Sequence, residues 1–283
     1  MNFKLNRKGF SVLIMLSLIA CTVKPPPSMS FASTVESLKP HLKFFKPEGA
    51  PPFKTVIYIP GLTERGWNKF YDDHMNKITQ HGYAVIALNY NSAHGLSSTS
   101  IRIGWFLPHY GAGDIYAVFE IAKQTEWVDK DKIVLWGFSY GGGLIWDSLV
   151  LAGPGMRPGG LLDRPNSVLG GLKGVVVRSP FCMNDFLGVK VTAAASGNFF
   201  LKPPMLVVIG GNDQIVNQTL CNQIVSKNDK NGAPIELVRY DKAGHSFFVQ
   251  NSLNSGKKID HYDQALARKS DAKIFEFLGK ALN

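Results

Sequence analysis

Residues that could together perform nucleophilic chemistry occur at three separate points of the sequence. Ser139 is the centre of Gly-Phe-Ser-Tyr-Gly, Asp213 ends Gly-Gly-Asn-Asp, and His245 is the centre of Ala-Gly-His-Ser-Phe. A serine hydroxyl is a weak nucleophile at neutral pH, so it needs an adjacent base, and that base needs an acid to orient it. A serine, an acid and a histidine in this chain order therefore predict a serine activated for attack on a carbonyl group.

The glycines around the serine have a steric explanation. An apolar run at 132–136 leads directly into Gly137, and Gly141 follows the serine by two positions. A strand that turns at once into a helix strains its central residue, and side chains at the flanking positions would collide. The pattern alone is weak evidence because it also arises by chance. Its strand–turn–helix setting is what indicates a nucleophile elbow.

The elements that must position these groups alternate along the chain. Short apolar runs predict buried strands, at 55–59, 83–88, 133–136, 174–178, 205–209 and 235–240. Amphipathic spacing predicts helices, at about 67–81, 113–125, 214–228 and 261–282, with another directly after the glycine turn. This order is typical of an α/β fold with a mostly parallel sheet of about eight strands and helices on both faces. Ligand sites in such sheets lie beyond the C-terminal strand ends, where the serine, the aspartate and the histidine all fall.

Each candidate also has a purely structural interpretation. Asp213 could cap the helix expected from about residue 214, and Asp185, shortly after the strand 174–178, is an alternative acid. His245 could be a structural loop histidine. The other histidines on predicted helix faces or in loops read as solvated or capping groups: His41, His74, His81, His94 and His261.

Two backbone N–H groups are candidates for binding a developing oxyanion. Tyr140 follows the serine directly, and Leu62 follows Pro60-Gly61 at the end of the first predicted strand. An oxyanion hole needs two preorganised donors at these two places of a nucleophile-elbow fold. The side chains matter little in this role because the backbone makes the bonds.

Taken together, these motifs resemble the α/β-hydrolase superfamily, and within it the dienelactone hydrolase-like group. The likeness rests on the three motifs above and on Val-Ile-Tyr-Ile-Pro-Gly at 56–61, and it extends over residues 42–283. It implies a hydrolase without cofactor or metal that forms an acyl-enzyme, with Ser139, Asp213 and His245 as its triad. The chain departs from the dienelactone hydrolases at the nucleophile, which is cysteine there, and at Pro60, where the usual residue is histidine.

Aromatic residues in two insertions could hold an apolar acyl or alkyl group. The first insertion, 97–113, contains Trp105, Phe106 and Tyr110, and the second, 181–204, contains Phe186. The alternative is that these residues cover the sheet as part of the core. The second insertion is too short for a large lid, so we expect a small lid or none.

The first residues have the pattern of a targeting segment. Lys4, Arg7 and Lys8 precede an apolar run at 10–20, which is too short to span a bilayer. The run ends in Leu-Ile-Ala-Cys, which resembles the lipobox of bacterial lipoproteins and implies lipidation of Cys21. We therefore expect a signal peptide at 1–20, a Pro/Ser-rich tether at 21–41 and a catalytic domain at 42–283. The resemblance favours an outer-membrane anchor facing the periplasm; an ordinary secretory signal is the alternative.

The remaining cysteines and the charge restrict the setting further. Cys182 and Cys221 form an even pair that could be a disulfide in an oxidising compartment or two buried free thiols. The formal charge of +10 is spread along the chain without basic runs interleaved with aromatics, so we expect no nucleic-acid partner. The sequence thus favours a small-molecule ester as substrate. A serine peptidase, a thioesterase or a non-catalytic binding protein of the same fold are the alternatives.

Overall fold

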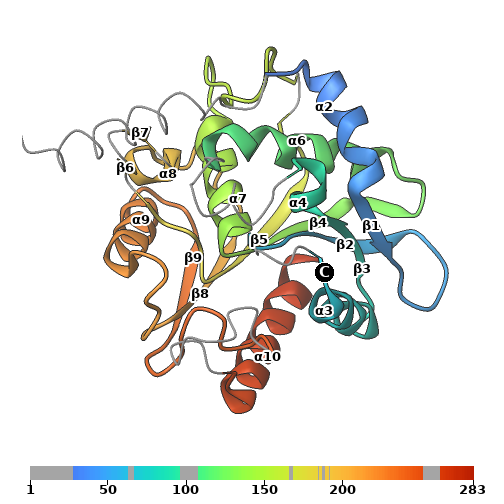
Figure 1. Ribbon diagram of the computed structural model, residues 1–283. Coiled ribbons are helices and arrows are strands. Elements are labelled where there is room, and N and C mark those ends of the chain that lie inside the picture. The colour runs from blue at the N-terminus through green and yellow to red at the C-terminus, as the bar shows by residue number, and fades with distance from the viewer. Residues whose placement is uncertain are drawn as a thin grey trace, which may run out of the picture.

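The computed structural model describes residues 28–62, 67–95, 108–165, 168–183, 185–186, 189–190, 192–250 and 262–283. Within these ranges a seven-stranded sheet forms the centre, in the order β1-β3-β2-β4-β5-β8-β9 (Figure 1). Only β1 runs antiparallel to its neighbour, and the other pairs are parallel. The strands are β1 (Leu42–Phe45), β2 (Phe53–Ile59), β3 (Ala84–Leu88), β4 (Val128–Phe138), β5 (Leu172–Arg178), β8 (Met205–Gly210) and β9 (Ile235–Tyr240).

The six predicted strands are all present, and most contain an apolar run that is buried on both faces, whereas β9 at the edge of the sheet is largely exposed. β3 and β8 are buried along their whole length, as is the second half of β2. The prediction missed β1, an edge strand of four residues with only its first residue buried. Such a short, half-exposed aromatic stretch does not give the pattern of a buried strand.

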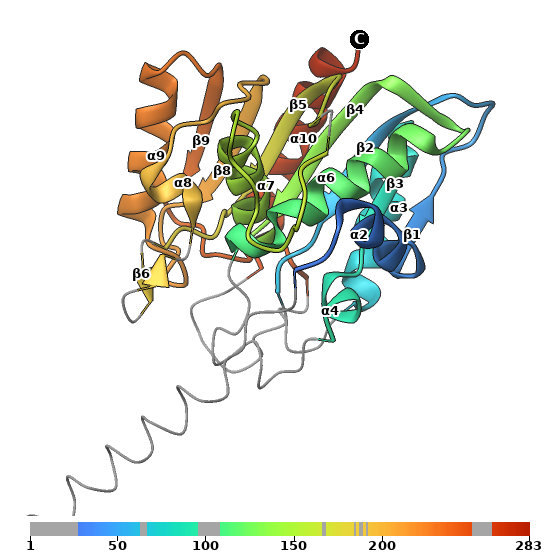
Figure 2. The ribbon, with the colours of Figure 1, turned by 90° about the horizontal axis from the view of Figure 1, so that it is seen from above.

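Helices cover both faces of the sheet and bury two separate apolar clusters against it. Figure 1 shows α6 and α7 on one side and α3 and α10 on the other, and Figure 2 shows the same layers from above. On the first side lie α2 (Phe31–Leu38), α6 (Pro108–Gln124), α7 (Tyr140–Leu151), α8 (Ala193–Ser196) and α9 (Gln218–Lys230). On the second lie α3 (Lys69–Gln80) and α10 (Gln264–Ala281). Two short helices, η1 (Lys39–His41) and α4 (Tyr90–Ala93), are the others within the described ranges.

The prediction of a tether over 21–41 is wrong for residues 31–38. Residues 31–38 form α2, which is capped by Ser30 and buries Val35 and Leu38 in the core. The chain before it is held by hydrogen bonds from Met29 N–H to the Gly160 carbonyl (3.0 Å) and from the Leu162 N–H back to the Met29 carbonyl (2.7 Å). A few well-placed apolar residues therefore outweigh the Pro/Ser-rich composition that suggested a tether.

The second insertion, 181–204, contains a small hairpin of β6 (Asp185–Phe186) and β7 (Val189–Lys190), followed by α8. No described helix is long and apolar enough to cross a bilayer.

The parallel strands end together, and this alignment positions the site. Gly137 of β4 pairs with Ile59 of β2, and the next residue of β4, Phe138, pairs with Arg178 of β5. β8 and β9 end at the paired residues Gly210 and Tyr240. The loops that follow these ends carry the serine, the aspartate and the histidine, so three distant sequence motifs meet at one edge of the sheet.

Candidate active site

Ser139 lies at the junction of β4 and α7 in a backbone conformation that residues other than glycine rarely adopt. Its φ is 51° and its ψ is −117°. The strained turn is held by three backbone hydrogen bonds. The Ser139 N–H donates to the Arg178 carbonyl (3.0 Å), and its carbonyl accepts from Phe181 (2.9 Å) and Gly143 (3.1 Å). A non-glycine residue persists at such a φ only where its surroundings fix it, as is common at active sites.

The glycines beside the serine allow close backbone contacts. A Cβ at Gly137 would lie 2.7 Å from the Gly141 carbonyl oxygen, and a Cβ at Gly141 would lie 2.7 Å from the Pro60 carbonyl oxygen. Real Cβ atoms do not come this close to backbone atoms, so either side chain would push α7 away from the strand ends. The predicted steric reason for these glycines is therefore confirmed.

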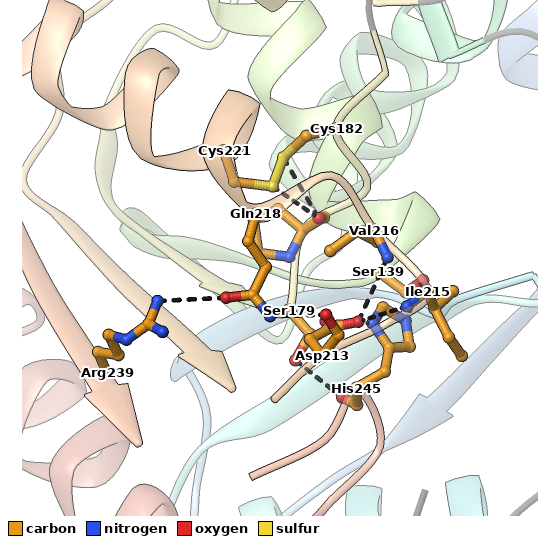
Figure 3. Close-up of polar contacts among 11 residues, drawn as sticks. Ser139, Ser179, Cys182, Asp213, Ile215, Val216, Gln218, Cys221, Arg239 and His245 are labelled. Atoms are coloured by element: carbon orange, nitrogen blue, oxygen red, sulfur yellow. Dashed lines mark hydrogen bonds and ion pairs between the residues drawn. A yellow bond between two sulfur atoms is a disulfide. The ribbon is translucent and has the colours of Figure 1, made fainter. Parts of the chain in front are cut away.

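His245 connects the serine to the aspartate (Figure 3). Its Nε2 lies 2.8 Å from Ser139 Oγ, and its Nδ1 lies 2.7 Å from Asp213 Oδ2. A carboxylate can only accept, so Nδ1 carries a proton, and in this tautomer Nε2 can accept from the serine hydroxyl. His245 and Asp213 are only 4% and 7% exposed, which keeps water from competing for these bonds. The arrangement can remove a proton from the serine as it attacks.

The carboxylate that contacts His245 belongs to Asp213, whereas the alternative, Asp185, lies in the β6–β7 hairpin. Its second oxygen, Oδ1, accepts from the N–H groups of Ile215 (2.9 Å) and Val216 (3.3 Å). Asp213 does not cap α9, which begins at Gln218 behind the capping residue Asn217. The loop between strand and helix is thus longer than predicted and folds around the carboxylate.

Two features that hold this loop were not predicted from the sequence. The Gln218 side chain donates to the Asp213 carbonyl (2.6 Å) and accepts from Arg239 (3.2 Å). Ser179, which follows β5, donates its hydroxyl to the His245 carbonyl (2.8 Å; Figure 3). The Gln218–Asp213 bond spans five positions, whereas the Arg239–Gln218 and Ser179–His245 bonds span 21 and 66. The only sequence signal for the Ser179 bond is a polar residue directly after a buried strand.

Comparisons with known proteins agree with this architecture. A family model described as the alpha/beta hydrolase fold matches residues 54–148, and one described as the dienelactone hydrolase family matches residues 184–282. The chain is an α/β-hydrolase-fold protein similar to dienelactone hydrolases. No curated protein matches it in sequence.

Solved structures share the α/β-hydrolase fold at low sequence identity. A dienelactone hydrolase-like promiscuous phosphotriesterase from metagenomic libraries is 16% identical, with a TM-score of 0.64 over 86% of this chain and 92% of that one. Esterase 2 of Thermogutta terrifontis, with propionate bound, is 17% identical, with a TM-score of 0.55 over 83% and 89%. The same esterase phosphonylated by cyclosarin is 16% identical, with a TM-score of 0.57 over 83% and 88%. At these identities the likeness establishes the fold.

Both expected oxyanion donors of this α/β-hydrolase fold come from segments beside the serine. Tyr140 is the first residue of α7, so its N–H lies at the positively polarised end of the helix. A Cβ at Gly61 would lie 3.0 Å from Ser139 Cβ, which places the Gly61–Leu62 segment against the nucleophile. The Tyr140 side chain is buried beside the rings of Tyr90 and Phe181, and burial raises the pKa of its phenol well above the usual range.

Of the four residues expected to bind substrate, only Tyr110 has side-chain contacts that the structure describes. Trp105 and Phe106 lie outside the described residues, and Phe186 is described only as part of β6. Tyr110 packs on the core cluster, and its ring would be 3.1 Å from a Cβ at Gly159. These contacts of Tyr110 correspond to the alternative interpretation, a residue that covers the sheet.

Cys182 and Cys221 form a disulfide with a Cα–Cα distance of 5.5 Å (Figure 3). The bond joins the segment after β5 to α9, which follows the acid loop. Because Phe181, next to Cys182, donates to the Ser139 carbonyl, the disulfide connects the surroundings of the nucleophile and the acid. Cys21 lies outside the described residues. Among the described residues, no cluster of three His, Cys, Asp or Glu side chains could hold a metal ion.

Proposed function

We propose that the protein is a serine hydrolase that cleaves a small to medium ester through an acyl-enzyme on Ser139. The observation that carries this proposal is the hydrogen-bonded chain from Ser139 through His245 to Asp213 at the strand ends. The family matches support the hydrolase class. The esterase with the same fold, solved with propionate bound, favours an ester of a short acid.

In the proposed reaction, Ser139 Oγ attacks the ester carbonyl while His245 Nε2 takes its proton. Asp213 holds the ring in the required tautomer and stabilises the imidazolium. The oxyanion that forms accepts from the N–H groups of Leu62 and Tyr140. His245 then gives its proton to the leaving alcohol, and a water molecule activated by the same ring releases the acid from Ser139.

A substrate panel tests the proposed reaction. p-Nitrophenyl acetate, butyrate and octanoate would be compared with a p-nitroanilide and a thioester of the same acids, using the wild type and Ser139→Ala. We expect the oxyesters to be cleaved fastest and Ser139→Ala to lose turnover on the order of 10⁴-fold or more. Ser226→Ala, on the exposed side of α9, is the control and should match the wild type. Faster cleavage of the thioester or anilide would replace the ester assignment, and a folded wild type without turnover would favour a binding protein.

We also propose that the protein is anchored to a membrane through a lipid on Cys21, on the periplasmic side. The Leu-Ile-Ala-Cys pattern supports the anchor, and a disulfide suits an oxidising compartment. Ser28, whose hydroxyl donates to the Gly159 carbonyl (2.8 Å), follows Cys21 by seven positions, so a fully extended chain between them would span about 25 Å at most. The mass of the mature N-terminus from a membrane extract tests this. Diacylglyceryl on Cys21 is expected, and an unmodified cysteine or a different N-terminus would contradict it.

A further inference from the structure

Two consecutive residues, Arg178 and Ser179, contact the segments that carry all three groups of the candidate triad. The Arg178 carbonyl accepts from the N–H of Ser139 (3.0 Å). The Ser179 N–H donates to Val208 on β8, the strand that leads to the acid (2.7 Å). The Ser179 hydroxyl donates to the carbonyl of His245 (2.8 Å). Two neighbouring residues thus bond the backbones of Ser139 and His245.

Ser179 is held rigidly at this position. Its side chain is 1% exposed, and its φ of 47° is one of three positive values among the described non-glycine residues. A buried hydroxyl that donates to the His245 carbonyl from a strained backbone position has little freedom to follow a moving loop. The bond to the His245 carbonyl therefore fixes the backbone of the base itself.

The Arg178 side chain contacts the same loop at two residues that follow His245. Its guanidinium carbon lies 3.5 Å from the ring centroid of Phe248 and 5.1 Å from that of Phe247. Asp271 on α10 fixes the guanidinium with a bond of 2.9 Å, and Lys77 on α3 bonds the other oxygen of Asp271 (2.5 Å). Burial raises the pKa of Asp271, but the nearby cations outweigh burial and lower it overall, so this carboxylate stays charged.

Phe248 also contacts the residue that precedes Ser139. Its ring packs at 4.8 Å and nearly perpendicular to Phe138, the residue before Ser139. Phe138 in turn lies 5.5 Å from the His245 ring. The histidine loop is thus fixed at one point by a hydrogen bond and at another by ring stacking, both from the end of β5.

We propose that Arg178 and Ser179 are positioning residues that set the 2.8 Å separation between His245 Nε2 and Ser139 Oγ. The inference rests on the proposed hydrolase function. Proton transfer needs a heavy-atom separation of about 2.6–3.2 Å, and a displacement of about 1 Å can cost on the order of 100-fold in rate. His245 carries a proton in both acylation and deacylation, so a displaced loop lowers kcat whichever step limits turnover. Both residues are 1% exposed, so neither can contact a bound substrate, and we expect KM to stay the same.

The test measures kcat and KM of the full chain on the best ester of the panel. Ser179→Gly removes the hydroxyl without straining the positive φ, and we expect about a tenfold fall in kcat with KM within twofold. Arg178→Lys keeps a cation for Asp271 but loses the planar group over Phe248, and kcat should fall several-fold with KM unchanged. Ser148→Ala is the matched control. Its equally buried hydroxyl donates to the Ile145 carbonyl within α7 (2.7 Å), so its kcat should equal that of the wild type.

The outcomes separate the positioning role from the hydrolase proposal. If the wild type turns over and both variants, folded at the assay temperature, keep kcat within twofold, the positioning role is refuted and the hydrolase proposal stands. A rise in KM at constant kcat would also refute it, because that result indicates a substrate contact. If the folded wild type shows no turnover, the hydrolase proposal fails and the positioning role fails with it.

Discussion

A carboxyl group buried in the nucleophile helix gives a quantitative prediction. Asp147 lies on α7, eight residues after Ser139, and is fully buried. Burial raises its pKa from 3.8 to about 7, although the N–H groups of Ala194 and Ala193 at the start of α8 favour the charged form. The bond from Ala194 N–H to Asp147 Oδ1 is 2.9 Å. The folded protein therefore keeps a proton on this group that the unfolded chain loses.

The sign and size of the effect follow from linkage. Between pH 4 and 7 the folded state binds more protons than the unfolded state, so this group lowers stability as the pH rises. A shift from 3.8 to about 7 corresponds to roughly 4 kcal/mol at pH 8 and roughly 2 kcal/mol at pH 5. Asp147→Asn removes this destabilisation. It also buries an amide whose hydrogen bonds are incompletely satisfied, which lowers stability by about 1–3 kcal/mol. That second cost does not depend on pH.

The quantity to measure is therefore the change with pH, by urea unfolding of the full chain at pH 5 and pH 8. The free energy of unfolding of Asp147→Asn, taken relative to that of the wild type, should be about 2 kcal/mol higher at pH 8 than at pH 5. Asp131→Asn, at an exposed position, is the control, and its free energy of unfolding should differ from that of the wild type by the same amount at both pH values. An equal effect of Asp147→Asn at both values would refute the argument that the buried carboxyl stays protonated.

Three further predictions follow from the buried groups. Burial lowers the pKa of His74 from 6.5 to about 4, so this histidine should lower the free energy of unfolding by up to about 3 kcal/mol from pH 6.5 to 4; the measurement is the difference between the wild type and His74→Leu in urea unfolding at both pH values, in which the other titrating groups cancel. Replacing Cys182 and Cys221 by serine should lower stability by about 4 kcal/mol or less, read as a lower Tm, because the bond closes a separation of 39 residues. Asp213→Asn should lower kcat on the order of 10³–10⁴-fold with little change in Tm, and unchanged kcat would exclude it as the acid.

The sequence predicted the parts of the site that are local to a strand end. Ser139, Asp213 and His245 each follow a buried strand, and the parallel order brings such ends to one edge of the sheet. The elbow was predictable because its Gly-x-Ser-x-Gly pattern directly follows a buried strand, and the contact that requires Gly137 is local, whereas the one that requires Gly141 is with the distant Pro60 carbonyl. The existence of each partner could be inferred from motif order, whereas the 2.7–2.8 Å distances between them required the structure.

The remaining features depend on contacts between distant segments. Ser179 meets His245 across 66 positions, and Arg178 meets Asp271 across 93. Periodicity contains no information on such pairs. His74 was expected as a solvated or capping group, but α3 turns it into the core, where it contacts Trp136 and Phe248.

Helix boundaries were missed where a local signal competed with the apolar pattern. α6 begins at Pro108 rather than near 113, and proline is favoured in the first turn of a helix. α9 begins after Asn217, whose side chain accepts from Leu220 N–H, while Asp213 is engaged by its own loop and by His245. The acidic residue nearest to a predicted helix is thus not always its cap.

Labelling with a fluorophosphonate probe tests the central claim, an activated serine at position 139, most directly. The folded full chain would be treated with the probe, digested, and the modified peptide sequenced by mass spectrometry. We predict a single adduct on Ser139 that is absent in Ser139→Ala and strongly slowed in His245→Ala, with Ser226→Ala labelled like the wild type. A folded wild type that takes no label, or an adduct on another serine, would contradict the claim that His245 and Asp213 activate Ser139.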